Sequence, residues 1–428
     1  MSIRGLEKFP YRICFLAVKS KLHPTRTGER NASIILEGFP GIKPLGITSD
    51  ASEAVRALSE NGCKGLVLLV LSGGTENIIL NIVSNYRRPT LLVGFGEHNS
   101  LAALVEAYSL LSTMDVQVYP LFLDINRLRE KSQRTAIEET VLPLMSVIAL
   151  RNARIGIIGK PSSWLVYAGR QAGDIKSVLH SNIINISLNM LYSEYEKADA
   201  DPGEVEGLRS VSSSDLEVEG LRNVIRLYKA MRRLVEGLNL NAVTIECFKT
   251  IEDLGVSPCY ALARLNSEGI DAGCEGDLPA LVTMMVLHTI SGTPAFMGNF
   301  AAIRDNSIIL SHCTAPISIA LNYMLTRHFE TGVPAGVAAR LPEGRVATIA
   351  KMDLSKRKLL YFKGKIKGSG LLSPKLCRTQ ALVEVGFDPQ LLVEAGFGNH
   401  LVLVPGDYTR HLRVTAKLLR LEPVSPEA

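Results

Sequence analysis

The stretch GLVLLVLSGGTE at residues 65–76 decides the fold class. Its first seven residues are apolar or small throughout, which predicts a strand buried on both faces, and Ser72-Gly73-Gly74 ends the run. Similar apolar runs and intervening helix-like stretches lie at residues 11–18, 50–62, 89–94 and 100–111. Continuous apolar strands separated by helices indicate a parallel sheet covered on both sides. Ligands of such sheets bind beyond the carboxyl ends of the strands.

The same pattern begins again at residues 154–159 and continues through a strand-like run at 242–247. After about residue 293 it changes to short strand-like runs separated by glycine-containing turns, which favours antiparallel pairing. We therefore predict an α/β protein with two doubly wound parallel-sheet domains, followed by a mainly antiparallel β C-terminal domain. The expected boundaries are 1–150, 151–292 and 293–428.

The composition is that of a globular protein. Of the 428 residues, 46% are hydrophobic and 21% are charged, which excludes a disordered or coiled-coil chain. A net charge of +5 is too small over this length to indicate a nucleic-acid partner. The longest apolar run, near residues 66–71, is far shorter than the roughly 20 residues of a membrane-spanning helix. No nucleic-acid or membrane partner is expected.

The seven cysteines are an odd number and include no CxxC pair. We expect reduced thiols in a cytoplasmic protein. A zinc site made of Cys247, Cys259, Cys274 and Cys313 would lack the close pairs that thiolate sites use, so these side chains are better explained as small buried hydrophobes. A dinucleotide loop at residues 94–99 lacks its third glycine, and no organic cofactor is expected.

A basic run occupies residues 351–378, with nine basic residues and one acidic residue. A basic hairpin could bind RNA or an anionic sugar. A solvated strand edge protected by lysines is the commoner reason for such a composition, and it is the structure we expect here.

Potential metal ligands concentrate in the second half of the chain. Glu275 and Asp277 flank Gly276, Asn299 and His312 follow, and His400 lies near the C-terminus. Oxygen ligands with one or two imidazoles suit Mn²⁺, Mg²⁺ or a similar divalent cation. In an extended segment Glu275 and Asp277 would point to opposite sides, so that one ligates while the other supports a ligand. The alternative for a single histidine such as His312 is a buried core residue.

Three short segments that contain these candidate ligands resemble a known family. CEGD at residues 274–277, GTPAFMGN at 292–299 and LSHCTAP at 310–316 resemble the L-fucose isomerase and L-arabinose isomerase superfamily, and in particular its shorter fucose isomerase-like proteins. GKPSSWL at 159–165, the helix start at 99–101 and the late Gly398-Asn399-His400 also fit that group.

The resemblance implies a homo-oligomeric aldose–ketose isomerase, an intramolecular oxidoreductase that acts on a small sugar. In such enzymes a Mn²⁺-type ion holds the oxygens of the open-chain sugar while a carboxylate moves a proton between C1 and C2 through an enediol. Glu275 matches the catalytic, metal-binding glutamate, and His312 and His400 match the histidine ligands. Asn299 is implied as the fourth ligand.

Asn299 is also the main departure from the family, whose second carboxylate lies in this segment. An amide can ligate a cation through its oxygen but cannot accept a proton. Either Asp277 or water then takes the second acid–base role, or the reaction differs. The alternatives are a metal-dependent epimerase or lyase that uses one carboxylate, and a non-catalytic sugar-binding protein.

Overall fold

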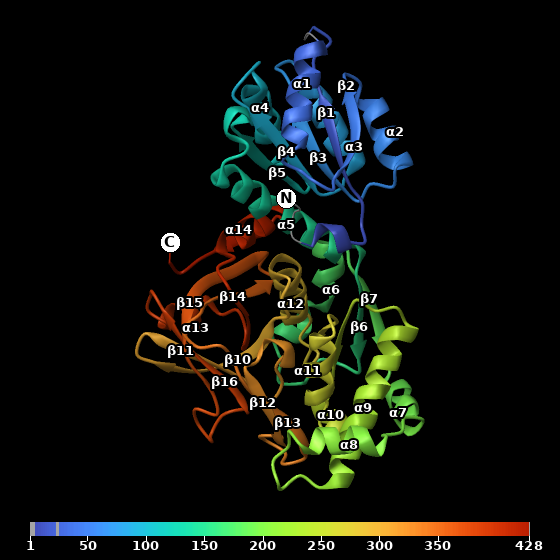
Figure 1. The fold of residues 1–428 in the computed structure, drawn as a ribbon, viewed down its shortest axis with the longest axis vertical. Coiled ribbons are helices and arrows are strands. Elements are labelled where there is room, and N and C mark those ends of the chain that lie inside the picture. The colour runs from blue at the N-terminus through green and yellow to red at the C-terminus, as the bar shows by residue number, and fades with distance from the viewer. Residues whose placement is uncertain (1–4, 23–24, 428) are drawn as a thin grey trace. The chain divides into compact units, whose positions relative to one another are not determined.

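A computed structural model describes residues 5–22 and 25–427 (Figure 1). The chain forms two compact units, Met1–Ala149 with Arg410–Glu422 and Leu150–Thr409 with Pro423–Ala428. The expected fold class is confirmed, because two parallel sheets flanked by helices precede an antiparallel sheet. The three domains expected at 1–150, 151–292 and 293–428 stay a prediction.

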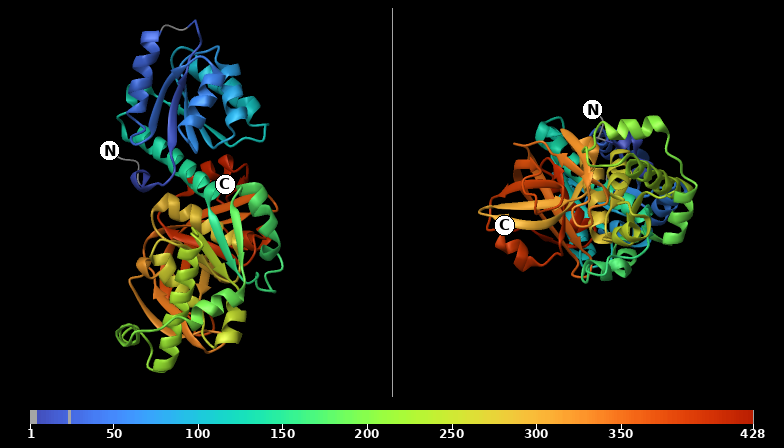
Figure 2. Two further views of the ribbon diagram at one scale, coloured as in Figure 1. Left: turned by 90° about the vertical axis from the view of Figure 1, so that its right-hand side faces the viewer. Right: turned by 90° about the horizontal axis from the view of Figure 1, so that it is seen from below.

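The first unit is built on a five-stranded parallel sheet in the order β2-β1-β3-β4-β5. Its strands are β1 (Ile13–Val18), β2 (Lys43–Thr48), β3 (Gly65–Val70), β4 (Thr90–Phe95) and β5 (Val118–Leu123). Its helices are α1 (Thr25–Leu36), α2 (Ala51–Glu60), α3 (Glu76–Tyr86), α4 (Ser100–Leu111), α5 (Lys131–Asn152) and α14 (Thr409–Leu418). Figure 2 shows this sheet with helices on both sides.

Burial explains why the apolar runs became strands. Every residue of β1, β3 and β4 is buried. Alternate residues of β1 and β3, such as Leu16 and Leu68, pack with α2, α3 and α4 in one apolar cluster. Asp50 caps α2, since its carboxylate accepts hydrogen bonds from the N–H groups of Ser52 and Glu53.

Two of the cysteines are joined. Cys14 and Cys63 form a disulfide with a Cα–Cα distance of 5.8 Å, so the expectation of reduced thiols throughout is wrong for this pair. The two thiols meet because of the tertiary structure. β1 and β3 are parallel neighbours with Ile13 opposite Gly65, and this pairing brings together two thiols that are 49 residues apart in sequence.

The second unit begins with a four-stranded parallel sheet in the order β7-β6-β8-β9. Its strands are β6 (Arg154–Ile158), β7 (Asn182–Ile186), β8 (Ala242–Ile245) and β9 (Asp271–Gly273). The helices of this unit are α6 (Ala172–Asp174), α7 (Leu188–Glu196), α8 (Pro202–Arg209), α9 (Val218–Gly237), α10 (Cys247–Leu254), α11 (Cys259–Ser267), α12 (Leu278–Ser291) and α13 (Gln390–Ala395).

The same unit contains an antiparallel sheet in the order β14-β17-β10-β11-β16-β15-β18, which closes on itself because β14 also pairs with β15. Its strands are β10 (Phe296–Arg304), β11 (Ser307–His312), β14 (Val346–Asp353), β15 (Lys358–Gly370), β16 (Thr379–Val385), β17 (His400–Pro405) and β18 (Glu422–Val424); β12 (Asn322–Arg327) and β13 (Pro334–Arg340) form a separate hairpin. In the right-hand view of Figure 2 the orange strands of this sheet and the green and yellow helices of the unit lie on opposite sides.

This closure corrects the interpretation of the basic run. β14 pairs with β15 and β17, and β15 pairs with β14, β16 and β18, so neither is an edge strand. Lys363, Lys365 and Lys367 are exposed along one face of β15, but Lys351 of β14 is completely buried. β14 and β15 form a local hairpin with Asp353 opposite Lys358, but β14 also pairs with β17 through residues more than 50 apart in sequence, such as Ala347 and Pro405, and local composition does not reveal that partner.

α12 links the two sheets of this unit. It follows β9 of the parallel sheet and packs against β14 and β17 of the antiparallel sheet. The loop that enters α12 carries Glu275 and Asp277. Among residues 5–22 and 25–427, no helix is both long and apolar enough to cross a membrane.

Candidate metal centre

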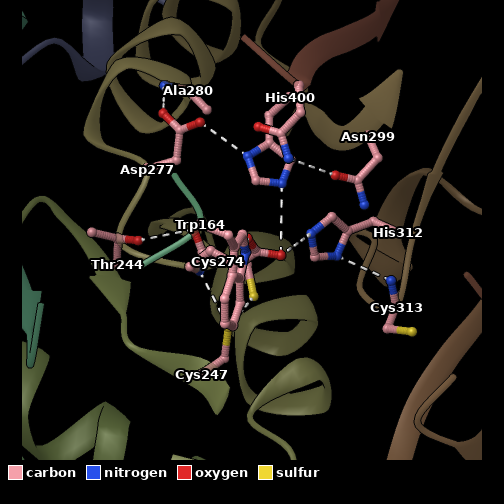
Figure 3. Close-up of polar contacts among 12 residues, drawn as sticks. Trp164, Thr244, Cys247, Cys274, Asp277, Ala280, Asn299, His312, Cys313 and His400 are labelled. Atoms are coloured by element: carbon pink, nitrogen blue, oxygen red, sulfur yellow. Dashed lines mark hydrogen bonds and ion pairs between the residues drawn. The ribbon is translucent and has the colours of Figure 1, made fainter. Parts of the chain in front are cut away.

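One loop and the ends of two strands bring three of the expected ligands together. Figure 3 shows two of them, His312 and His400, with Asn299 beside them. Glu275 follows β9, His312 is the last residue of β11 and His400 is the first residue of β17. β11 and β17 flank β10 on either side, and Asn299 of β10 lies opposite both Ser311 and His400. Segments more than 120 residues apart therefore meet at one end of the antiparallel sheet.

Glu275, His312 and His400 form a buried group whose ligand atoms lie within 4.8 Å of one another. The Oε1 atom of Glu275 is 4.0 Å from His312 Nε2 and 3.8 Å from His400 Nε2. Both Nε2 atoms are buried and have no hydrogen-bond partner in the part of the chain that the structure describes. Because a buried nitrogen without a partner is costly, this arrangement fits a divalent cation bound between the three side chains.

His400 is oriented as metal-binding histidines are. Its Nδ1 atom lies 2.9 Å from the Asp277 carboxylate, which fixes the proton on Nδ1 and leaves the Nε2 lone pair facing Glu275. Asp277 also accepts a hydrogen bond from Ala280 N–H at the start of α12 and pairs with Lys351. Burial alone would raise the pKa of Asp277, but Lys351 and His400 hold that pKa well below its usual range.

His312 is a neutral imidazole in this environment. Burial, and after it the neighbouring His400 and His328, lowers the pKa of His312 well below its usual range. Its Nδ1 atom accepts a hydrogen bond from Cys313 N–H at 3.0 Å, which places the ring proton on Nε2. Binding a cation through Nε2 requires the opposite tautomer, so ligation would exchange this hydrogen bond for a metal bond.

The backbone around Glu275 is unusual. Glu275 and Gly276 have φ values of 58° and 70°, both in the left-handed region that L-residues other than glycine rarely adopt. A Cβ on Gly276 would lie 2.5 Å from Pro161 Cα, so only glycine fits there. The segment is a tight turn and not extended, so the alternation expected of an extended segment does not apply to Glu275 and Asp277.

The loop that packs on this turn supplies Trp164. Ser162 N–H donates to the carbonyl of Glu275, and Trp164 Nε1–H donates to Glu275 Oε2 at 2.7 Å. The carboxylate therefore has one oxygen held by an indole and the other facing the two histidines. The side chain of Trp164 is half exposed and stacks edge-on against Phe248 at 4.6 Å.

A pocket of about 330 Å³ opens at Glu275, one of the three potential ligands, and its size suits a small molecule. Its lining combines two aromatic, two acidic and two amide side chains: Trp164, Phe248, Glu275, Glu330, Asn299 and Asn399. Asn399 Nδ2 donates to Asn299 Oδ1 at 3.0 Å. No lysine or arginine is among these lining residues.

The residues expected from the sequence thus fall into two groups. Glu275, His312 and His400 converge, and Asn299 lines the same pocket. Asp277 lies behind His400 with a completely buried side chain. Cys247, Cys259, Cys274 and Cys313 are all buried, and none joins the group of potential ligands.

Three residues at or near the site were not predicted from the sequence: Trp164, Glu330 and Lys351. Trp164 belongs to the motif at 159–165. As the only tryptophan of the chain, it could have been identified there as a candidate site residue. Glu330 and Lys351 carried no local signal, because one is an acidic residue in a turn and the other belongs to the basic run.

Comparison with known proteins gives two findings. No family model matches the chain. Sulfoquinovose isomerases from Alkalicoccus urumqiensis and Priestia aryabhattai are each 25% identical to it, over 328 residues (68% of this chain, 70% of the relative) and 317 residues (67% and 68%). One from Clostridium sp. strain MSTE9 is 28% identical over 221 residues (46% and 47%). These similarities point to a family of sugar isomerases and confirm the expectation of an isomerase.

Proposed function

We propose that this protein is a metal-dependent aldose–ketose isomerase of the fucose isomerase-like kind, with the site at Glu275, His312 and His400. The observation that carries the proposal is the pair of buried Nε2 atoms without hydrogen-bond partners in the described residues, which lie 4.0 and 3.8 Å from Oε1 of Glu275, a residue that lines the pocket. The similarity to sulfoquinovose isomerases supports the reaction class.

Mn²⁺ or another divalent cation would be held by Glu275, His312 and His400, with the Asn299 amide oxygen as a neutral fourth ligand. The ion supplies electrostatic stabilisation of the oxygen charge that develops when the sugar carbonyl enolises. This help is needed because the proton on the carbon beside the carbonyl is only weakly acidic.

Glu275 is the proposed base. Its carboxylate removes the proton from C2 of the aldose and returns it to C1, which carries the sugar through an enediol to the ketose. Trp164 Nε1–H, bonded to Oε2, restricts the carboxylate to one orientation. Asp277 acts through His400: it fixes the Nδ1 tautomer from a buried position outside the pocket.

The substrate class follows from the pocket and from the relatives. A volume of about 330 Å³ and two amide side chains suit a small polyhydroxylated molecule. Sulfoquinovose is one candidate substrate, because the relatives carry its name. L-fucose and L-arabinose are others, because the sequence motifs resemble the isomerases of these sugars. A homo-oligomeric state and a cytoplasmic location belong to the same proposal, and neither a nucleic-acid nor a membrane partner is proposed.

The test combines metal binding with a sugar screen. Metal-free protein is titrated with Mn²⁺ by calorimetry, and aldoses and ketoses, neutral and sulfonated, are incubated with and without Mn²⁺ and analysed after quenching with EDTA. We expect about one ion per chain, and at least tenfold weaker binding in Glu275→Gln and His312→Asn than in the control His180→Asn, an exposed histidine of the same unit.

The products separate the alternatives. Conversion of an aldose to its ketose supports the proposal, whereas epimers or cleavage products would replace it with the one-carboxylate reactions. Sugar binding without metal-dependent turnover would identify a binding protein instead. Unchanged Mn²⁺ affinity in both ligand variants would reject the site itself.

A further inference from the structure

A second carboxylate faces the pocket from a different part of the chain. Glu330 lies in the turn between β12 and β13 and lines the pocket together with Glu275. These two are the only acidic residues among its lining. Whereas Glu275 accepts a hydrogen bond from Trp164, Glu330 has neither a hydrogen bond nor an ion pair with any residue in the described ranges.

The turn that carries Glu330 is held in place from both ends. His328 N–H donates to Val333 O at 2.7 Å, and Gly332 N–H donates to His328 O at 3.0 Å. His328 Nδ1 lies 3.0 Å from Thr331 Oγ1. Glu330 is therefore an exposed residue of an ordered turn.

The same turn is tied to the site. Phe329 N–H donates to the Sγ atom of Cys313, the residue after His312. The His328 ring packs edge-on against Phe248, another residue of the pocket, at 5.6 Å. The position of Glu330 is thus set by contacts with the elements that place the ligands.

The proposed reaction needs a second proton carrier. Conversion of an aldose to a ketose moves one proton between two carbons and another between two oxygens, and Asn299 cannot accept a proton. Partial burial raises the pKa of Glu330. His328 lowers this pKa, and the nearby carboxylate of Glu275 raises it further, so that the net shift is upward. A carboxyl group with a raised pKa exchanges protons more readily near neutral pH.

We propose that Glu330 is a catalytic residue that moves the oxygen-bound proton, a role that the amide of Asn299 cannot take; the inference rests on the proposed isomerase function. As Glu275 takes the C2 proton, the C1=C2 bond forms and the Glu330 carboxyl group protonates O1. Glu330 then removes the O2 proton as the C2 carbonyl forms, and Glu275 returns its proton to C1. Both side chains end in their starting states, and no oxidant or reductant is consumed.

The test uses Glu330→Gln in the full chain, with Glu343→Gln, an exposed turn residue of the same unit, as the matched control. We expect Glu330→Gln to fold normally and to bind Mn²⁺ within about twofold of the wild type. Its turnover on the best sugar of the screen should fall by roughly 10²–10⁴. In D₂O its exchange of the substrate C2 proton should fall less than product formation, because Glu275 still acts while the oxygen transfer is blocked.

The outcomes are distinguishable from failure of the proposed function. If the wild type turns over sugars and Glu330→Gln is as active as Glu343→Gln, the role of Glu330 is refuted while the isomerase stands. A tenfold or greater loss of Mn²⁺ affinity in Glu330→Gln would also overturn it, by making Glu330 a ligand. A wild type without isomerase activity would refute both.

Discussion

Replacement of Lys351 by methionine should destabilise the unit that carries the candidate metal centre, because it leaves the buried carboxylate of Asp277 without its cation. The two side chains are 1% and 0% exposed, and Lys351 Nζ lies 3.0 and 2.8 Å from the two carboxylate oxygens. Methionine preserves most of the length of the lysine stem, so the packing changes little. Removal of one partner of a buried ion pair costs about 3–5 kcal/mol.

The expected shift in melting temperature follows from the size of the unit. Leu150–Thr409 and Pro423–Ala428 make up roughly 270 residues. With an unfolding entropy of about 2.1 cal/mol/K per residue, a loss of 3–5 kcal/mol lowers Tm by roughly 5–9 °C. Calorimetry in EDTA measures this shift without a contribution from bound metal.

A double-mutant cycle isolates the pairing. Asp277→Asn retains an N-cap side chain for α12 but leaves the Lys351 ammonium buried without a counter-ion, so its cost should be similar to that of Lys351→Met. The double variant leaves no unpaired charge and should cost at least about 2 kcal/mol less than the sum of the two single changes. Costs that add within about 0.5 kcal/mol would refute the reasoning, since the two charges would then not depend on each other.

Three further predictions test other features. Gly276→Ala should lower the free energy of unfolding by at least about 1 kcal/mol more than Gly255→Ala does. Both positions have positive φ, but only at Gly276 would the added Cβ meet Pro161. Equal losses in a denaturant titration would contradict this. Because the pKa of His312 is lowered on folding, stability in EDTA should be fully present above about pH 6.5 and fall on acidification by up to about 1.4 kcal/mol per pH unit. His312→Asn should flatten that slope in urea titrations between pH 7.5 and 5.5. RNA binding by the basic run at 351–378 should vanish at physiological salt in a gel-shift assay, and specific binding that persists would indicate another class of protein.

The local structure of the first unit was readable from the sequence. The run at residues 65–71 became β3, and the expected helix at 100–111 is α4. Both are set by short-range rules: a strand buried on both faces must be apolar throughout, and α4 buries one face that carries Ala103, Leu104, Ala107 and Leu111. The chain carries this information within about ten residues, and no distant partner has to be known.

The candidate site was predictable only in part. Glu275, His312 and His400 were named from motifs, but their convergence depends on β10 lying between β11 and β17. The pairing of Lys351 with Asp277 and the place of Glu330 in the pocket lining had no sequence signal. Each depends on segments more than 50 residues apart.

The sequence by itself therefore determined the parallel and antiparallel elements and the residue types available for metal chemistry. Only the tertiary structure decided that the antiparallel sheet closes, that Lys351 is buried, that Cys14 meets Cys63 and that Asp277 stands behind His400. The physical reason is the range of the interactions. Burial patterns and caps act between near neighbours, whereas strand order and side-chain convergence are set by the packing of the whole unit.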